Sequence, residues 1–189
     1  MVIENFSLLT KEELKQFAEK LLNKINAENI FSSETNFELD DTAWWGTKDA
    51  NGARITGAFQ TDDMTGDLDI AIVTTDDVSA SVKATWQASE DDPYDFDYAS
   101  EEDPNFDELF GEEAIIDGYK VTLEVSDYDF IENEDVEVDD YTKEDSGIGS
   151  YEYWGHTGYD SHSYLEVEGT LTNTYKVYLS LNVSPATNK

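Results

Sequence analysis

The chain has 189 residues, of which 44 are acidic and 11 are Lys or Arg, so its formal net charge is −33. A field of this sign repels nucleic acid and anionic lipid, which excludes direct binding to DNA, RNA or a membrane surface. The absence of Cys excludes disulfides and thiolate metal sites, whereas 13% aromatic and 39% apolar residues predict a folded domain rather than a disordered acidic chain.

The first predicted element is an amphipathic helix that begins after Thr10. Thr10 and Glu13 have the spacing of a capping box. The apolar residues that follow recur at helical intervals as far as about Asn26: Leu14, Phe17, Ala18, Leu21, Leu22 and Ile25. We expect residues 1–29 to form an N-terminal helix that belongs to the same domain as the rest of the chain and packs on its sheet. The alternative is that its apolar face forms a homodimer or docks on a partner.

From residue 30 onward the apolar period changes to two, which is typical of strands with one buried face. The alternation predicts strands over 37–39, 55–59, 68–72, 78–88, 119–125 and 175–183, the last preceded in the same phase by Leu165, Val167 and Leu171. Residues 74–77 form a predicted turn. Residues 30–189 are therefore expected to be an acidic antiparallel β domain. The predicted fold class is α+β, with the N-terminal amphipathic helix packed on a mainly antiparallel β-sheet or small sandwich with acidic loops.

Two acid-dense tracts, 90–117 and 124–145, are expected to lie between the strands. Aromatic residues interleave both tracts, which favours carboxylates in fixed positions over a solvating tail. We expect their acidic residues to bind a basic partner. In the first tract these are Asp91, Asp92, Asp95, Asp97, Glu101, Glu102, Asp103, Asp107, Glu108, Glu112 and Glu113. In the second they are Asp127, Asp129, Glu132, Glu134, Asp135, Glu137, Asp139 and Asp140.

Catalytic and metal-binding patterns are weak in this sequence. There is no Gly-x-Ser-x-Gly elbow and no phosphate loop, and Arg54 is the only Arg, so we predict no enzymatic activity and no cofactor. His156, Asp160 and His162 have residue types that suit a two-histidine, one-carboxylate metal site. Local hydrogen bonding within a Gly- and Tyr-rich segment is the simpler interpretation, and no acidic run fits an EF-hand loop, so we predict no metal.

In its charge, size, lack of Cys and interleaving of acidic with aromatic residues, the chain resembles the acidic DNA-mimic inhibitor proteins of phages and mobile elements. The resemblance implies an anti-restriction or anti-CRISPR type of inhibitor that occludes the basic DNA- or RNA-binding surface of a partner. That partner would be a restriction enzyme, a CRISPR effector or a nucleoid protein. The implied location is the cytoplasm, in the host cell if a phage encodes the protein.

The alternative function is a glycan- or calcium-binding β-sandwich module of a surface protein. It is suggested by the aromatic residues Trp44, Trp45, Tyr151, Tyr153 and Trp154. The N-terminus lacks the basic start and long apolar run of a secretory signal, which favours the cytoplasm instead. Halophilic adaptation also produces acidic surfaces and is the other explanation of the charge.

Overall fold

The computed structural model describes residues 2–42, 54–56, 58–62, 64–89, 91–96, 99–153 and 156–186; for 54–56, 144–153 and 156–163 only the backbone is described. Its helices are η1 (Phe6–Leu8) and α1 (Lys11–Ala27). Its strands are β1 (Phe37–Leu39), β2 (Arg54–Thr56), β3 (Phe59–Thr61), β4 (Leu68–Thr74), β5 (Val78–Ser89), β6 (Ser100–Glu101), β7 (Glu113–Ile116), β8 (Tyr119–Tyr153) and β9 (His156–Pro185). One N-terminal α-helix and a mainly antiparallel sheet confirm the α+β class.

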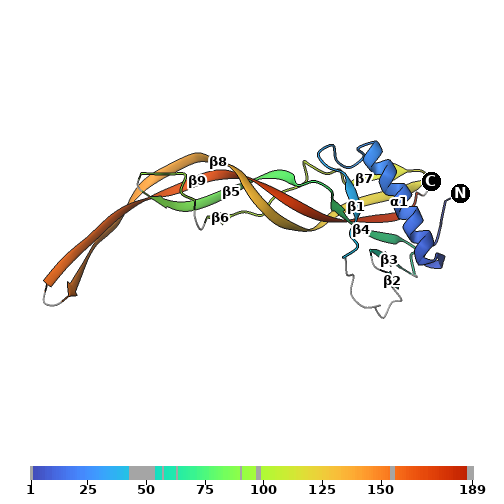
Figure 1. Cartoon of the computed structure of the whole chain (residues 1–189), viewed down its shortest axis with the longest axis horizontal. Helices are drawn as coiled ribbons and strands as arrows, with labels where there is room; N and C mark the ends of the chain where they lie inside the picture. The colour runs from blue at the N-terminus through green and yellow to red at the C-terminus, as the bar shows by residue number, and fades with distance from the viewer. Residues whose placement is uncertain are drawn as a thin grey trace. The chain divides into compact units, whose positions relative to one another are not determined.

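The predicted N-terminal helix is confirmed as α1, and it begins at the predicted capping box. Thr10 Oγ1 accepts a hydrogen bond from the Glu13 N–H at 3.2 Å, and Glu13 Oε1 accepts one from the Thr10 N–H at 3.1 Å. The apolar face of α1 is buried. On that side Phe17 contacts Tyr119 edge to face, with ring centroids 5.1 Å apart, and Figure 1 shows α1 crossing the strands of this part of the protein.

The strands pair in the order β2-β3-β4-β9-β5-β6, with β1 on β4, and with β8 between β7 and β9. The predicted strands at 37–39, 68–72 and 78–88 are confirmed as β1, β4 and β5. The single strand predicted at 55–59 is wrong: β2 and β3 are two antiparallel strands in which Thr56 lies opposite Phe59. The turn after Thr74 does not make β4 and β5 neighbours, because the C-terminal strand β9 pairs with both.

The described chain forms two compact units. Unit 1 contains residues 1–78, 106–131 and 175–189. It therefore holds α1, β1 to β4, β7, the part of β8 up to residue 131 and the part of β9 from residue 175. Its core includes an aromatic cluster in which the Phe106 ring lies 5.7 Å from both Tyr128 and Tyr175, and Phe110 lies 5.9 Å from Phe37. These rings bring together segments that are far apart in the sequence.

Unit 2 contains residues 79–105 and 132–174, and has its own apolar core. That core consists of Val82, Ala84, Trp86, Ala88, Leu165, Val167 and Leu171, with Phe96, Ala99, Val136 and Val138 packed against it. The indole N–H of Trp86 donates to the Pro93 carbonyl at 2.9 Å. This bond holds the segment after β5 over the buried face of the sheet.

The second acid-dense tract does not lie between strands as predicted. Residues 124–145 lie within β8, which runs from Tyr119 to Tyr153 and pairs with β9. The sequence signal was weak because most side chains of this stretch are exposed on both sides of the strand, so the usual alternation of apolar and polar residues is almost absent. The first tract is mostly loop, with only β6 and β7 as strands.

Candidate partner-binding surface

All the predicted partner-binding residues that the structure describes are exposed. Asp97 lies outside the described residues. Six of the others belong to unit 1: Asp107, Glu108, Glu112, Glu113, Asp127 and Asp129. The remaining twelve belong to unit 2: Asp91, Asp92, Asp95, Glu101, Glu102, Asp103, Glu132, Glu134, Asp135, Glu137, Asp139 and Asp140. The two sequence tracts are therefore not two surfaces, because each unit carries residues from both.

In unit 2, β8 and β9 present carboxylates on the face opposite the apolar core. Val136 and Val138 pack on the core, and because successive side chains of a strand point to opposite faces, Glu137 and Asp139 lie on the other face. Leu165 and Val167 are buried in the same core, which puts Glu166 and Glu168 on that same outer face. We call Glu137, Asp139, Glu166 and Glu168 the unit 2 acidic face.

Hydrogen bonds hold the carboxylate of Asp139 in place on this face. Asp139 Oδ2 accepts from Thr170 Oγ1 of β9 at 2.8 Å and from Lys83 Nζ of β5 at 3.2 Å. The pKa of Asp139 is held below its ordinary value. The largest cause is the hydrogen bond from Thr170, followed by the hydrogen bond and positive charge of Lys83. Asp139 therefore stays ionised at neutral pH in a fixed position.

Other acidic residues are positioned in the same way. Glu134 Oε2 accepts a hydrogen bond from the Ser79 hydroxyl at 2.9 Å, and Glu166 Oε1 accepts one from the Gln87 amide at 3.2 Å. In unit 1, Asp129 accepts from the Tyr178 hydroxyl at 2.9 Å, and this bond raises the pKa of Tyr178. Uncharged polar side chains of β5 and β9 thus position the carboxylates of Glu134, Glu166 and Asp129.

Three backbone donors of β8 are satisfied by the carboxylate directly before them. The N–H groups of Tyr128, Val136 and Tyr141 donate to the preceding aspartates, Asp127, Asp135 and Asp140, at 2.8 to 2.9 Å. Beyond Thr122, the last residue paired with β7, β9 is the only described strand that pairs with β8. These aspartates therefore occupy backbone donors of a strand that has one open edge in the described part of the chain.

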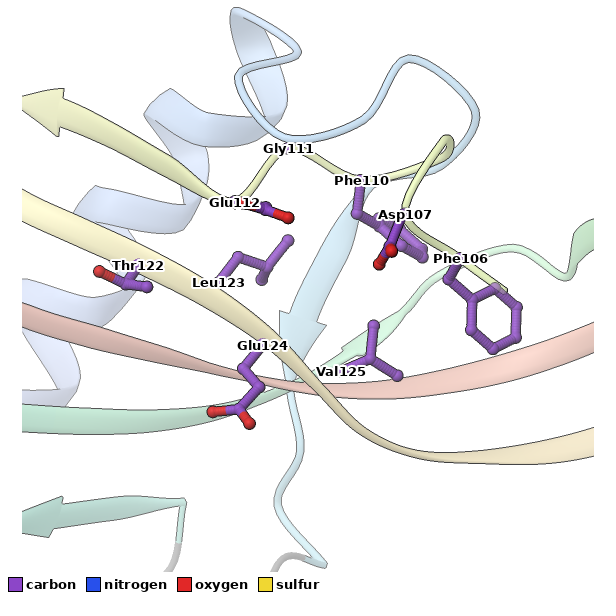
Figure 2. Close-up of a pocket in the computed structure, with 9 residues that line it drawn as sticks. All are labelled: Phe106, Asp107, Phe110, Gly111, Glu112, Thr122, Leu123, Glu124 and Val125. Atoms are coloured by element: carbon purple, nitrogen blue, oxygen red, sulfur yellow. The ribbon is translucent and has the colours of Figure 1, made fainter. Parts of the chain in front are cut away.

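Unit 1 contains a cavity of about 390 Å³ beside β8, drawn in Figure 2. Its walls include the apolar side chains Phe106, Phe110, Leu123 and Val125. It is also lined by the predicted residues Asp107 and Glu112, whose carboxylates lie at its rim, and by Gly111, Thr122 and Glu124. The sequence placed Asp107 and Glu112 in the first acidic tract and Leu123 in a strand. Nothing in the sequence indicated that these three residues line one cavity. Tertiary packing brings the loop before β7 onto β8, and no local sequence pattern records that contact.

Sequence reasoning missed Glu166, Glu168 and Thr170 as part of the acidic surface. The signal was present: the buried Leu165 and Val167 belong to the predicted C-terminal alternation, so the residues between them had to face outward. Glu137 and Asp139 lie two apart in β8, the spacing at which side chains share one face of a strand.

The features that suggested other functions lie largely outside what the structure describes. Trp44, Trp45 and Trp154 lie outside the described residues, and the side chains of Tyr151, Tyr153, His156, Asp160 and His162 are not described. Among the residues with described side chains, no group of three or more His, Asp or Glu residues is placed to hold a metal ion. In the described part of the chain, no helix has both the length and the apolar character needed to cross a membrane.

Comparisons with protein-family models, with curated proteins and with solved structures found no match to this chain.

Proposed function

We propose that this protein binds the nucleic-acid-binding surface of a basic partner protein and blocks it, with carboxylates in the place of phosphates. The observation that carries the proposal is the unit 2 acidic face. Its four acids lie two apart on each of two paired strands, on the side opposite an apolar core. A folded core behind the acids gives them fixed positions, which a disordered acidic tail lacks.

The spacing of these acids suits such a role. Residues two apart on a strand lie about 6.7 Å from each other, so two paired strands that both carry acids present about one charge per 3.4 Å of strand length. This is close to the charge spacing of about 3.4 Å per strand in a nucleic acid helix. Lysines and arginines arranged to follow a phosphate backbone would meet carboxylates at a similar interval, and release of counterions would favour the complex.

The partner class follows from the charge. A net charge of −33 favours proteins with clustered Lys and Arg, such as restriction enzymes, CRISPR effectors or nucleoid proteins. Inhibition would be competitive and non-enzymatic: the partner's cations pair with Asp and Glu, and nucleic acid is excluded from the same surface. The partner would meet this protein in the cytoplasm.

The proposal is tested by capture of binding partners from a lysate, followed by displacement. Duplex DNA and single-stranded RNA are added separately to the captured complexes, and the proposal expects one of them to release the partner. Binding should also weaken steeply with salt, because the Debye length falls from about 10 Å at 0.1 M to about 3 Å at 1 M. A captured partner that neither nucleic acid displaces, or that stays bound at high salt, would contradict the proposal.

Charge reversal at the unit 2 acidic face sharpens the test. Glu137→Lys with Glu168→Lys changes the net charge by four units on the exposed side of β8 and β9. The control, Glu19→Lys with Glu34→Lys, makes the same change at exposed residues of unit 1. We expect the first variant to lose at least about tenfold in affinity for the partner and the control to lose much less. A close charge pair at an interface contributes about 1.5 kcal/mol or more, and about 1.4 kcal/mol corresponds to a tenfold change in affinity. Equal losses would mean that net charge alone, and not this face, determines binding.

A further inference from the structure

We propose that the cavity beside β8 in unit 1 binds the guanidinium side chain of an arginine presented by a basic partner protein. The cavity, about 390 Å³ in volume, is at the small end of the range for ligand sites, which suits one long side chain rather than a cofactor. The proposal rests on the proposed function for the identity of the partner, but the binding of the side chain itself does not depend on it.

The walls of the cavity suit the flat, weakly hydrated guanidinium group. Phe106 and Phe110 lie with ring centroids 6.2 Å apart at an interplanar angle of 53°, and Leu123 and Val125 complete an apolar floor. Arginine stacks on aromatic rings and loses less hydration than lysine when it enters such a site. An ammonium group would have to give up a tightly held water shell against the same walls.

Carboxylates stand at the rim where the guanidinium nitrogens would lie. Figure 2 shows the Glu112 and Asp107 carboxylates on the same side of β8 as Leu123 and Val125, whereas Glu124 extends to the opposite side of the strand. Among the described residues that line the cavity there is no Lys, Arg or His. A cation with an apolar stem therefore has charge complementarity at the rim and apolar contact below it, and arginine combines the two.

The site is already formed in the free protein. The Leu123 N–H donates to the Glu112 carbonyl at 2.8 Å, and the Gly111 N–H donates to the Phe31 carbonyl at 2.8 Å, so the rim segment is fixed on both sides. The aromatic walls are held by the unit 1 core through Tyr128, Tyr175 and Phe37. A preformed site avoids the entropic cost of ordering its walls when a ligand binds.

The probes are three small molecules of one backbone: the Nα-acetyl methylamides of arginine, lysine and citrulline. They are titrated into the full chain at physiological salt, and the methyl signals of Leu123 and Val125 are followed by NMR. We expect the arginine probe to shift these methyls saturably and at the lowest concentration. Citrulline has the shape of arginine without its charge, and lysine has the charge without the planar group. Equal affinity for all three probes would overturn the proposal, and so would NMR shifts spread over the whole acidic surface.

Two variants separate this cavity from the general negative field. Glu112→Gln removes a rim carboxylate, and we expect about a tenfold loss of affinity for the arginine probe, as for the loss of a charged hydrogen-bond partner. Glu113→Gln removes the same charge one residue away, at a side chain that pairs with Lys120 at 3.7 Å and does not line the cavity. Equal effects of the two variants would overturn the proposal. Both residues are exposed, and an unchanged amide spectrum will verify that each variant is folded.

The two proposals fail in different ways. If the arginine probe does not bind but nucleic acid still displaces a captured partner, the cavity proposal is wrong and the proposed function stands. If the probe binds as expected but no captured partner is displaced by nucleic acid, the cavity is an arginine site and the proposed function is wrong.

Discussion

Gly169 in β9 leaves the space that the Trp86 indole of β5 fills. A Cβ atom at residue 169 would overlap Trp86 Cη2, and would lie 2.8 Å from Trp86 Cζ3 and 2.5 Å from the Glu137 carbonyl oxygen of β8. Three strands of unit 2 therefore meet at one position where no side chain fits. The unit 2 acidic face lies on the other side of the same strands, so this packing supports the carboxylates from behind.

Gly169→Ala should destabilise unit 2. The added methyl group meets the rigid Trp86 ring and backbone, neither of which moves without disturbing the sheet, so we expect a loss of about 1–3 kcal/mol in the free energy of unfolding. Urea denaturation followed by near-UV circular dichroism measures it. The control is Gly111→Ala, where the nearest atom to a new Cβ would be Phe31 Cδ1 at 3.4 Å. A variant at residue 169 as stable as this control would contradict the packing described here.

Thr170→Val should raise the pKa of Asp139 toward its ordinary value. The Thr170 hydrogen bond is the largest cause of the lowered pKa, and valine keeps the shape without the donor. A pH titration of the Asp139 carboxyl carbon by NMR measures the change. Thr172→Val, two residues along the same strand, removes a hydroxyl whose contact is with Ser81 and should leave the titration of Asp139 unchanged.

The lowered pKa also has a consequence for stability. A carboxyl whose pKa is lower in the folded state stabilises the fold above its unfolded pKa, and that contribution disappears as the pH falls through the folded value. The contribution of Asp139 is therefore present at neutral pH and lost in acid. In Thr170→Val it should be smaller at neutral pH, and the difference between variant and parent should vanish at low pH.

Asp69→Asn should stabilise unit 1 at neutral pH. The pKa of Asp69 is raised, and burial is the largest cause. The hydrogen bond from Asn182 lowers this pKa, whereas three nearby negative charges raise it further: Asp67, Asp62 and Glu124. Because the folded pKa is above the unfolded one, the ionised group costs stability at high pH, and the cost fades as the pH falls through the raised value. An asparagine removes the charge, and its carbonyl oxygen still accepts from Asn182.

Thermal melts of this variant at about pH 8 and about pH 4 test the sign, since the ordinary Asp pKa is about 3.9. At the higher pH we expect the variant to have a higher melting midpoint than the parent. At the lower pH we expect a smaller difference between their midpoints. Asp77→Asn, at an exposed residue, removes one charge without relieving burial and serves as the control. A midpoint gain that is the same at both pH values would contradict the argument.

Calcium and magnesium should stabilise the protein equally at matched ionic strength. Both screen the repulsion among the carboxylates, and no described group of side chains is placed to hold a metal. Thermal melts in the two salts provide the comparison. A saturable rise at low millimolar calcium, with magnesium much weaker, would contradict this prediction and favour the calcium-binding surface module.

Removal of the aspartates that cap β8 donors should increase self-association. Asp135→Ala with Asp140→Ala removes the carboxylates that accept from two backbone N–H groups of β8. Because successive N–H groups of a regular strand point to opposite edges, one of these two groups faces the open edge, where it can pair with another chain. We expect larger species by light scattering, most clearly at high salt, where repulsion is screened. Glu132→Ala with Glu137→Ala removes the same charge from β8 and should have a smaller effect. If both variants remain equally monodisperse, the capping role is wrong.

The sequence by itself determined the elements whose signals are local. Thr10 and Glu13 begin α1, because a capping box needs only residues three apart, and the spacing from Leu14 to Ile25 defines its buried face. The strict alternation from Val78 to Ser89 likewise predicted β5, since each apolar residue there is buried and each polar one is exposed. The exposure of the acidic residues followed from the cost of burying charge.

Only the tertiary structure decided where the acidic residues lie relative to one another. The acidic part of β8 has two largely exposed faces, so its alternation was too weak to predict a strand, and pairing with the distant β9 holds it extended. The same pairing brings Asp139 to Thr170, and the packing of Phe106 and Phe110 beside Leu123 forms the cavity under Glu112. These contacts join residues far apart in the chain, and no local period in the sequence records which distant segments meet.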